Sequence, residues 1–226
     1  MSARARSVDA RGLTLSLALG GVGFVPVLGM HGDDGAVLGV LAWLALIAAS
    51  SGALAAACGV RFWPLGLVPP AAWAIVLALV SATGDGSTVP SPGLALLAWS
   101  GLHALGFGAQ CWVRRDLAAP LAVAALALAA LPFAPLLVLG LRPTPAWSGR
   151  LLDASPVTFV VESAGIDWAR QPWVYERAGG ADLGPGTRVP WSSPLAAGAA
   201  VVVGCVLATL GERRSRRPAP SSRNAP

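Results

Sequence analysis

The sequence has few charges, and its positive charge is carried by arginine alone because lysine is absent. Only 12% of the 226 residues are charged, roughly half the fraction of a typical soluble domain, whereas 55% are hydrophobic. Long windows contain no ionisable residue, which excludes soluble domains of ordinary composition. The remaining class is a membrane protein. Because exclusive use of arginine is typical of GC-rich bacterial genomes, the predicted location is the bacterial cytoplasmic membrane.

Short motifs of common enzymes are absent as well. The chain has no phosphate-binding loop of the form GxxxxGKS or GxxxxGKT, no HExxH and no CxxC. It therefore does not hydrolyse ATP through such a loop of its own, and we expect neither enzymatic activity nor a cofactor. His31, Asp33 and Asp34 lie close together in "HGDDG", but a second group of ligands is missing. We expect a solvated turn there and no metal site.

Six apolar windows are long enough to cross a membrane as helices. A crossing helix needs about 20 apolar residues, since it rises about 1.5 Å per residue through a hydrocarbon core of roughly 30 Å. Helices are required because lipid offers backbone polar groups no partners. The windows are residues 12–30, 36–60, 64–83, 92–113, 117–141 and 194–211. The predicted fold class is an all-α polytopic membrane bundle with six transmembrane helices.

The arginines outside the longest loop gather on one side of this predicted bundle. They are Arg4, Arg6, Arg11, Arg61, Arg114, Arg115, Arg213, Arg214, Arg216, Arg217 and Arg223. The positive-inside rule then places both termini in the cytoplasm, as an even number of spans requires. The excess of arginine is thus explained by topology, and we expect no nucleic-acid partner. The cluster formed by Arg213, Arg214, Arg216 and Arg217 is expected to face the anionic lipid of the bilayer.

This topology divides the chain into five parts. They are a basic cytoplasmic N-terminus (1–11), a five-span membrane region (12–141), an extracytoplasmic loop (142–193), a sixth span (194–211) and a basic, disordered tail (212–226). Within the loop, Ser155 is a preferred helix N-cap, Pro156 a preferred first helical residue and Gly165 a preferred stop. These residues predict a short helix in the first half of the loop.

A second short helix is predicted after Pro172, in "PWVYERA". Trp168, Trp173 and Tyr175 lie in the same stretch, and both residue types are enriched at the level of lipid headgroups. We therefore predict short amphipathic helices that lie on the outer membrane surface and cap the bundle, with these three aromatic residues as interfacial anchors.

The fourth window is the most polar one. Ser100, His103, Phe107 and Gln110 follow a helical spacing and share one face. Ser100, His103 and Gln110 are therefore the candidates for contacting a substrate or a neighbouring helix. A Ser100–His103 nucleophile and base is a weak alternative, since residues on one helix face need not meet in hydrogen-bonding geometry.

His103 lies near the predicted bilayer centre, where an ionisable residue is a functional candidate by default. It could ligate haem, relay protons or contact a substrate. A neutral imidazole that bonds neighbouring helices is the favoured alternative. The windows contain no permanently charged residue of the kind that ion-coupled carriers use.

The layout of the chain resembles that of the permease subunits of bacterial ABC transporters of the exporter-related class. Those permeases have six spans, cytoplasmic termini and short helices in an outer segment between the fifth and sixth spans. The matching part comprises "SPVTFVVESAG" and "PWVYERAGG" within residues 142–193. The resemblance concerns layout and carries over no functional residue. It implies a transport function with a separate ATPase.

Three functions from different classes follow from the sequence. The first is a membrane subunit or accessory component of a transport or export complex, with an ATPase or other membrane subunit as a separate partner. The second is a structural or assembly factor that binds a partner through the outer loop. The third is an intramembrane redox or enzymatic protein that uses His103.

Overall fold

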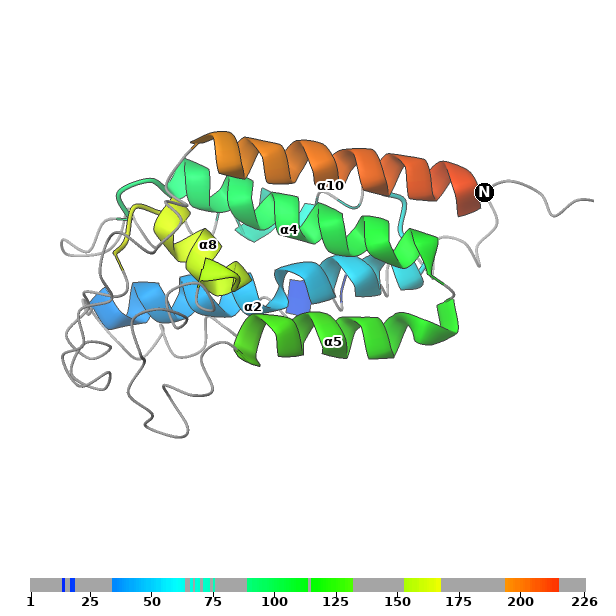
Figure 1. Cartoon of the computed structure of the whole chain (residues 1–226), viewed down its shortest axis with the longest axis horizontal. Helices are drawn as coiled ribbons and strands as arrows, with labels where there is room; N and C mark the ends of the chain where they lie inside the picture. Colours follow the sequence, from blue (N-terminus) through cyan, green and yellow to red (C-terminus); the bar gives the residue numbers. More distant parts are fainter. Residues whose placement is uncertain are drawn as a thin grey trace, which may run out of the picture.

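The computed structural model describes residues 14, 17–18, 34–63, 66, 68–69, 71–73, 75, 89–113, 115–131, 153–167 and 194–215. Their elements are α2 (Asp34–Ala57), α4 (Pro92–Trp112), the short 3-10 helix η3 (Arg115–Leu117), α5 (Ala118–Ala130), α8 (Pro156–Ser163) and α10 (Pro194–Ser215). Within these ranges every regular element is a helix and none is a strand, which confirms the predicted all-α class for the part that is described (Figure 1).

Three of these helices are long and apolar enough to cross a membrane. They are the stretches Gly39–Ala57, Pro92–Trp112 and Pro194–Arg214, which coincide with the second, fourth and sixth predicted windows. α5 starts within one residue of the fifth window but is short, with 13 residues. Most of the first and third windows lies outside the described residues. The helices indicate a membrane protein, while the number of spans stays a prediction.

α4 lies between α10 and α2, and α5 packs against α2 (Figure 1). α2, α4 and α10 run in the same direction, and α5 runs in the opposite one. The bundle therefore has two distinct ends. The α8 end is where α4 and α10 begin, and the Arg213 end is where α2, α4 and α10 finish and α5 begins.

Glycines allow the helix backbones to approach closely. A Cβ added to Gly204 of α10 would lie 2.7 Å from the carbonyl oxygen of Gly101 on α4, which is too close for any side chain. A Cβ on Gly106 of α4 would meet the backbone of Ala49 on α2. The two contacts of α4 therefore depend on backbone-to-backbone packing, as is common between membrane helices.

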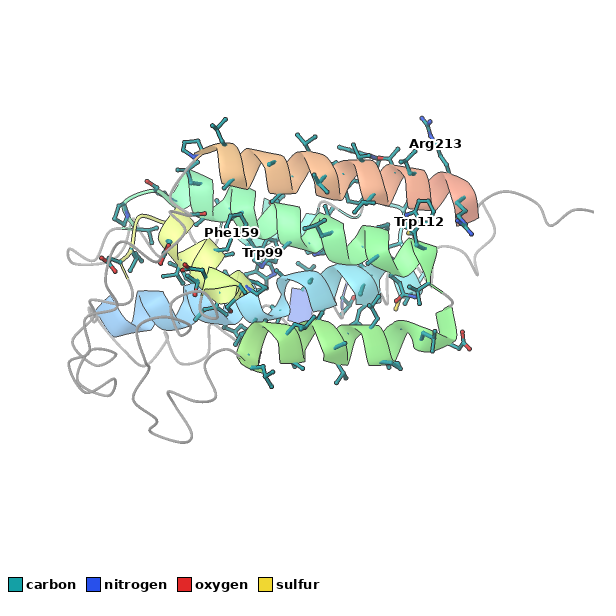
Figure 2. All side chains as sticks on the ribbon, viewed as in Figure 1. Trp99, Trp112, Phe159 and Arg213 are labelled. Carbon is teal, nitrogen blue, oxygen red and sulfur yellow. The ribbon has the colours of Figure 1, made fainter. Side chains whose placement is uncertain are left out.

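Two clusters of buried side chains fill the bundle. The first, toward the α8 end, joins Trp99 of α4 and Leu44 of α2 with Phe159 of α8. Figure 2 labels Trp99 and Phe159 where α4 meets α8. The second, toward the Arg213 end, joins Phe62 to Phe107, whose ring centroids lie 5.1 Å apart. Together they hold α2, α4 and α8 as one packed body.

α8 begins and ends where the sequence predicts a helix. Ser155 is its N-cap, with Oγ accepting from the backbone N–H of Val157 at 3.2 Å, and Pro156 is the first helical residue. Gly165 has φ +82°, and the N–H of Ile166 bonds the carbonyl of Val161 at 3.3 Å, which is the Schellman ending that favours glycine. Local sequence signals therefore determine both ends of this helix.

The environment of α8 differs from the prediction. A surface helix would have one face in water, but six of the eight α8 residues are buried: Val157, Thr158, Phe159, Val160, Val161 and Ser163. The helix packs against α2 and α4 and so occupies the end of the bundle. Its run of β-branched and aromatic residues fits a buried helix better than an amphipathic one. The helix predicted after Pro172 lies outside the described residues.

Candidate functional site

His103 lies near the middle of α4 and is completely buried, with 0% of its surface exposed. Trp99, one turn earlier, stacks on the imidazole with ring centroids 5.7 Å apart and ring planes at 29°. The indole N–H of Trp99 donates to the carbonyl of Leu44 on α2 at 2.6 Å. The close approach of α2 and α4 therefore positions both rings.

Both ring nitrogens of His103 are hydrogen-bonded. Nδ1 lies 2.8 Å from Oγ of Ser51 on α2, and Nε2 lies 3.0 Å from the carbonyl oxygen of Gly66. The N–H of Gly66 in turn donates to the carbonyls of Arg61 and Phe62 at 2.8 and 3.0 Å. Because a carbonyl oxygen only accepts, Nε2 carries the proton, and in the neutral ring Nδ1 accepts from the Ser51 hydroxyl.

The Ser51 hydroxyl has a second acceptor on its own helix. Its Oγ also lies 2.9 Å from the carbonyl oxygen of Ala48. One hydroxyl proton is thus shared between the His103 ring and a backbone carbonyl. The network fixes the tautomer and orientation of the imidazole. It also connects α2, α4 and the turn that contains Gly66.

The predicted site residues are only partly brought together. His103 and Gln110 are buried along α4, with Phe107 between them, whereas Ser100 is half-buried. The serine at the imidazole is Ser51 of α2, which the sequence interpretation did not single out. One signal was present: Ser50 and Ser51 are the only hydroxyl-bearing residues of the second window. Such residues in an apolar helix indicate hydrogen bonds to neighbouring helices.

Ser50, on the adjacent face of α2, also forms a hydrogen bond to a neighbouring helix. Its hydroxyl donates to the carbonyl of Ala122 on α5 at 2.9 Å, and both residues are buried. The pair "SS" therefore bonds α2 to two different neighbours, α5 and α4. These two hydrogen bonds position an otherwise apolar helix against its neighbours.

The Ser51–His103 contact has the distance that a nucleophile and its base require. Catalysis also requires room for a substrate beside both groups. Ser51 is 1% exposed and His103 is 0% exposed, so neither group faces solvent. The pair joins α2 to α4 inside the bundle.

A second group of buried polar residues lies within α8 and directly before it. Its members are Asp153, Ser155, Thr158 and Ser163. The Ser155 hydroxyl donates to the carbonyl of Ala129 on α5 at 2.8 Å and so fastens α8 to that helix. The Thr158 hydroxyl is fully buried and has no hydrogen-bond partner among the residues that the structure describes.

The basic cluster is described in part. Arg213 and Arg214 are exposed in the last turn of α10, and Arg213 points away from the bundle in Figure 2. Five other predicted site residues lie outside the described ranges: Trp168, Trp173, Tyr175, Arg216 and Arg217.

Within the ranges that the structure describes, no three His, Cys, Asp or Glu side chains lie close enough to hold a metal ion. Cys58, Cys111 and Cys205 are half-buried and in the thiol form. The chain matches no protein-family model, no curated protein and no solved structure.

Proposed function

We propose that the protein is a multi-pass component of the bacterial cytoplasmic membrane and serves as a membrane subunit or accessory component of a transport or export complex. In this proposal the chain crosses the membrane six times with both termini in the cytoplasm. A separate chain supplies the ATPase. α2, α4 and α10 correspond to the second, fourth and sixth predicted spans and run in one direction. α5 corresponds to the fifth and runs in the opposite direction, which supports an alternation of spans.

The peripheral position of α10 is the observation that carries the proposal. Only 22% of its apolar span is buried inside the bundle, against 67% for α2 and 56% for α4. In the half toward the α8 end, its outward residues Leu195 and Ala199 are exposed, and Gly198 has open space beside it. Small residues let a second membrane helix approach closely. This half of α10 fits a contact with another membrane subunit.

The His103 network supports an accessory role over an enzymatic one. The imidazole has both nitrogens bonded to groups of this chain, and its ring is stacked on Trp99. A group that relays protons or contacts a substrate needs a position facing the substrate path. In the described bundle His103 faces Ser51 and Gly66 instead.

The test is affinity purification of the full chain in mild detergent through a C-terminal tag. It is followed by identification of partners, an ATPase assay and a visible absorption spectrum of the same sample. We expect a second membrane subunit and a nucleotide-binding subunit to co-purify, and the sample to hydrolyse ATP. The variant Ala199→Phe should reduce the amount of the second membrane subunit, because a bulky ring prevents close helix approach while remaining compatible with lipid.

Val123→Phe is the matched control. Val123 is 65% exposed on the outward face of α5, so the same kind of substitution is made on another apolar surface. It should leave the partner in place. A partner without ATPase activity would favour the assembly-factor function, and a Soret band would favour a haem protein built on His103. Either result, or a protein that purifies alone, would contradict the proposal.

A further inference from the structure

The Arg213 end of the bundle gathers tryptophan and arginine from three segments that are distant in sequence. Trp63 follows α2, Trp112 is the last residue of α4, and Arg213 and Arg214 lie in the last turn of α10. Figure 2 shows Trp112 and Arg213 at this end. The two indoles are 53% and 46% exposed, and Arg61 is exposed nearby in sequence. Exposed tryptophan beside arginine is typical of the level of lipid headgroups.

Both indoles are fixed to α10 by hydrogen bonds. The Trp63 indole N–H donates to Oγ1 of Thr209 at 3.3 Å, and the Thr209 hydroxyl donates to the carbonyl of Cys205 at 2.7 Å. The Trp112 indole N–H donates to the carbonyl of Leu207 at 3.4 Å. The rings therefore flank the last two turns of α10 on opposite sides and leave its outward face open.

One arginine lies on each of these two sides of α10. The guanidinium carbon of Arg214 lies 4.9 Å from the ring centroid of Trp112. Arg213 follows Thr209 by four residues and so lies one turn further along the side that Trp63 contacts. A guanidinium that stacks through its face keeps the N–H groups along its edge available for a phosphate.

An apolar strip leads away from the arginines along the outward face of α10. Val206 and Leu210 are 50% and 47% exposed, and they precede Arg213 at helical spacing. An exposed apolar strip that ends at two arginines matches an amphiphile with an anionic head. Glu212 lies half-buried on the same turn, and two arginines against one carboxylate leave this turn with a net positive charge.

We propose that this end of the bundle is a binding site for an anionic phospholipid. Arg213 and Arg214 hold the phosphate, and an acyl chain lies along Val206 and Leu210. Trp63 and Trp112 flank the site at the level of the glycerol. A membrane protein of any function could carry such a site, so the lipid site is independent of the proposed transport role.

Native mass spectrometry of the full-length protein in detergent tests the site. The protein is titrated with dioleoyl phosphatidylglycerol and, separately, with dioleoyl phosphatidylcholine. We expect the wild type to retain the anionic lipid preferentially. The variant Arg213→Gln/Arg214→Gln should lose about tenfold in its affinity for phosphatidylglycerol, and its affinity for phosphatidylcholine should stay the same. Both arginines are exposed, so the helix remains folded.

Arg216→Gln/Arg217→Gln is the matched control, because it removes the same charge from the tail just beyond the site. It should keep the preference for phosphatidylglycerol. Equal losses in the two double variants would mean that tail charge alone attracts the lipid and would overturn the site. Displacement of phosphatidylglycerol by excess inorganic phosphate would assign the arginines to free phosphate and also overturn it.

A second pair of variants tests the indole. Trp112→Phe keeps an aromatic ring but weakens its attraction for the Arg214 guanidinium and removes the bond to Leu207. We expect about a threefold loss of affinity for phosphatidylglycerol. Trp43→Phe, in the first half of α2 and so away from the Arg213 end, should have no effect. Equal effects of the two variants would contradict the assignment.

Discussion

Oγ of Ser51 on α2 lies 2.8 Å from Nδ1 of His103 on α4, although 52 residues separate the two in sequence. The contact sets the rotation and the height of one helix against the other. It also occupies the imidazole nitrogen that would otherwise be free to accept a proton or a metal ion. The central polar pair of the described bundle is thus part of its framework, and this relation can be tested by measurements of stability.

Ser51→Ala should destabilise the protein by about 1 to 2 kcal/mol, because Nδ1 of His103 is left buried without its donor. The measurement is equilibrium unfolding in mixed micelles of a mild detergent and sodium dodecyl sulfate. Ser100→Ala is the control, since Ser100 is half-buried on α4 and should change the free energy of unfolding by less than about 0.5 kcal/mol. A larger effect at Ser100 than at Ser51 would contradict the assignment.

A double-mutant cycle separates this hydrogen bond from general packing. His103→Ala should cost about 3 kcal/mol through lost packing on Trp99 and two lost hydrogen bonds. In that background the Ser51 hydroxyl keeps the Ala48 carbonyl as its acceptor, so Ser51→Ala should cost little. We expect a coupling free energy of about 1 kcal/mol between the two sites. Strictly additive effects would show that the pair does not interact.

The sequence predicts most of what is local in this fold. α4 starts at Pro92 and α10 at Pro194, at the edges of predicted windows, because hydropathy and proline mark helix ends in membrane proteins. The ends of α8 follow from Ser155, Pro156 and Gly165 in the same way. Each of these signals acts on residues within one or two turns, so a single sequence is sufficient to locate it.

Contacts between helices were not predictable in the same way. The partner of His103 is Ser51, and the sequence contains no local signal that relates the register of α2 to that of α4. Ser100 looked like a partner only because it shares a helix with His103. The burial of α8 was missed for a similar reason: Val157 to Val161 form a short apolar run, and such a run fits a lipid surface or a protein interior equally well.

Glycine contacts between α4 and α10 give a further prediction. Gly204→Ala should destabilise the protein by about 2 kcal/mol, because the added Cβ would lie 2.7 Å from the Gly101 carbonyl oxygen and force the helices apart. Gly198→Ala on the same helix has open space for the methyl group and should stabilise the protein by about 0.5 kcal/mol. The unfolding assay described above measures both. Similar effects at the two positions would mean that α4 and α10 are not packed at Gly204.

Two hydroxyl groups of the α8 region should respond in opposite directions. Ser155→Ala removes the N-cap of α8 and its bond to the Ala129 carbonyl, so it should cost about 1 to 2 kcal/mol. Thr158→Val keeps the shape of the side chain and removes a buried hydroxyl that has no partner among the described residues. It should stabilise the protein by about 1 kcal/mol.

The Thr158→Val variant shows whether the Thr158 hydroxyl has a hydrogen-bond partner in the folded protein. If Thr158→Val raises the free energy of unfolding, as expected, its hydroxyl is an uncompensated polar group inside the α8 contact with α2 and α4. If the variant instead lowers it by as much as Ser155→Ala, the hydroxyl has a partner in the folded protein, and the prediction is wrong. Measuring both variants in the same micelles makes the comparison independent of the detergent, because each lies within one turn of the other on the same helix.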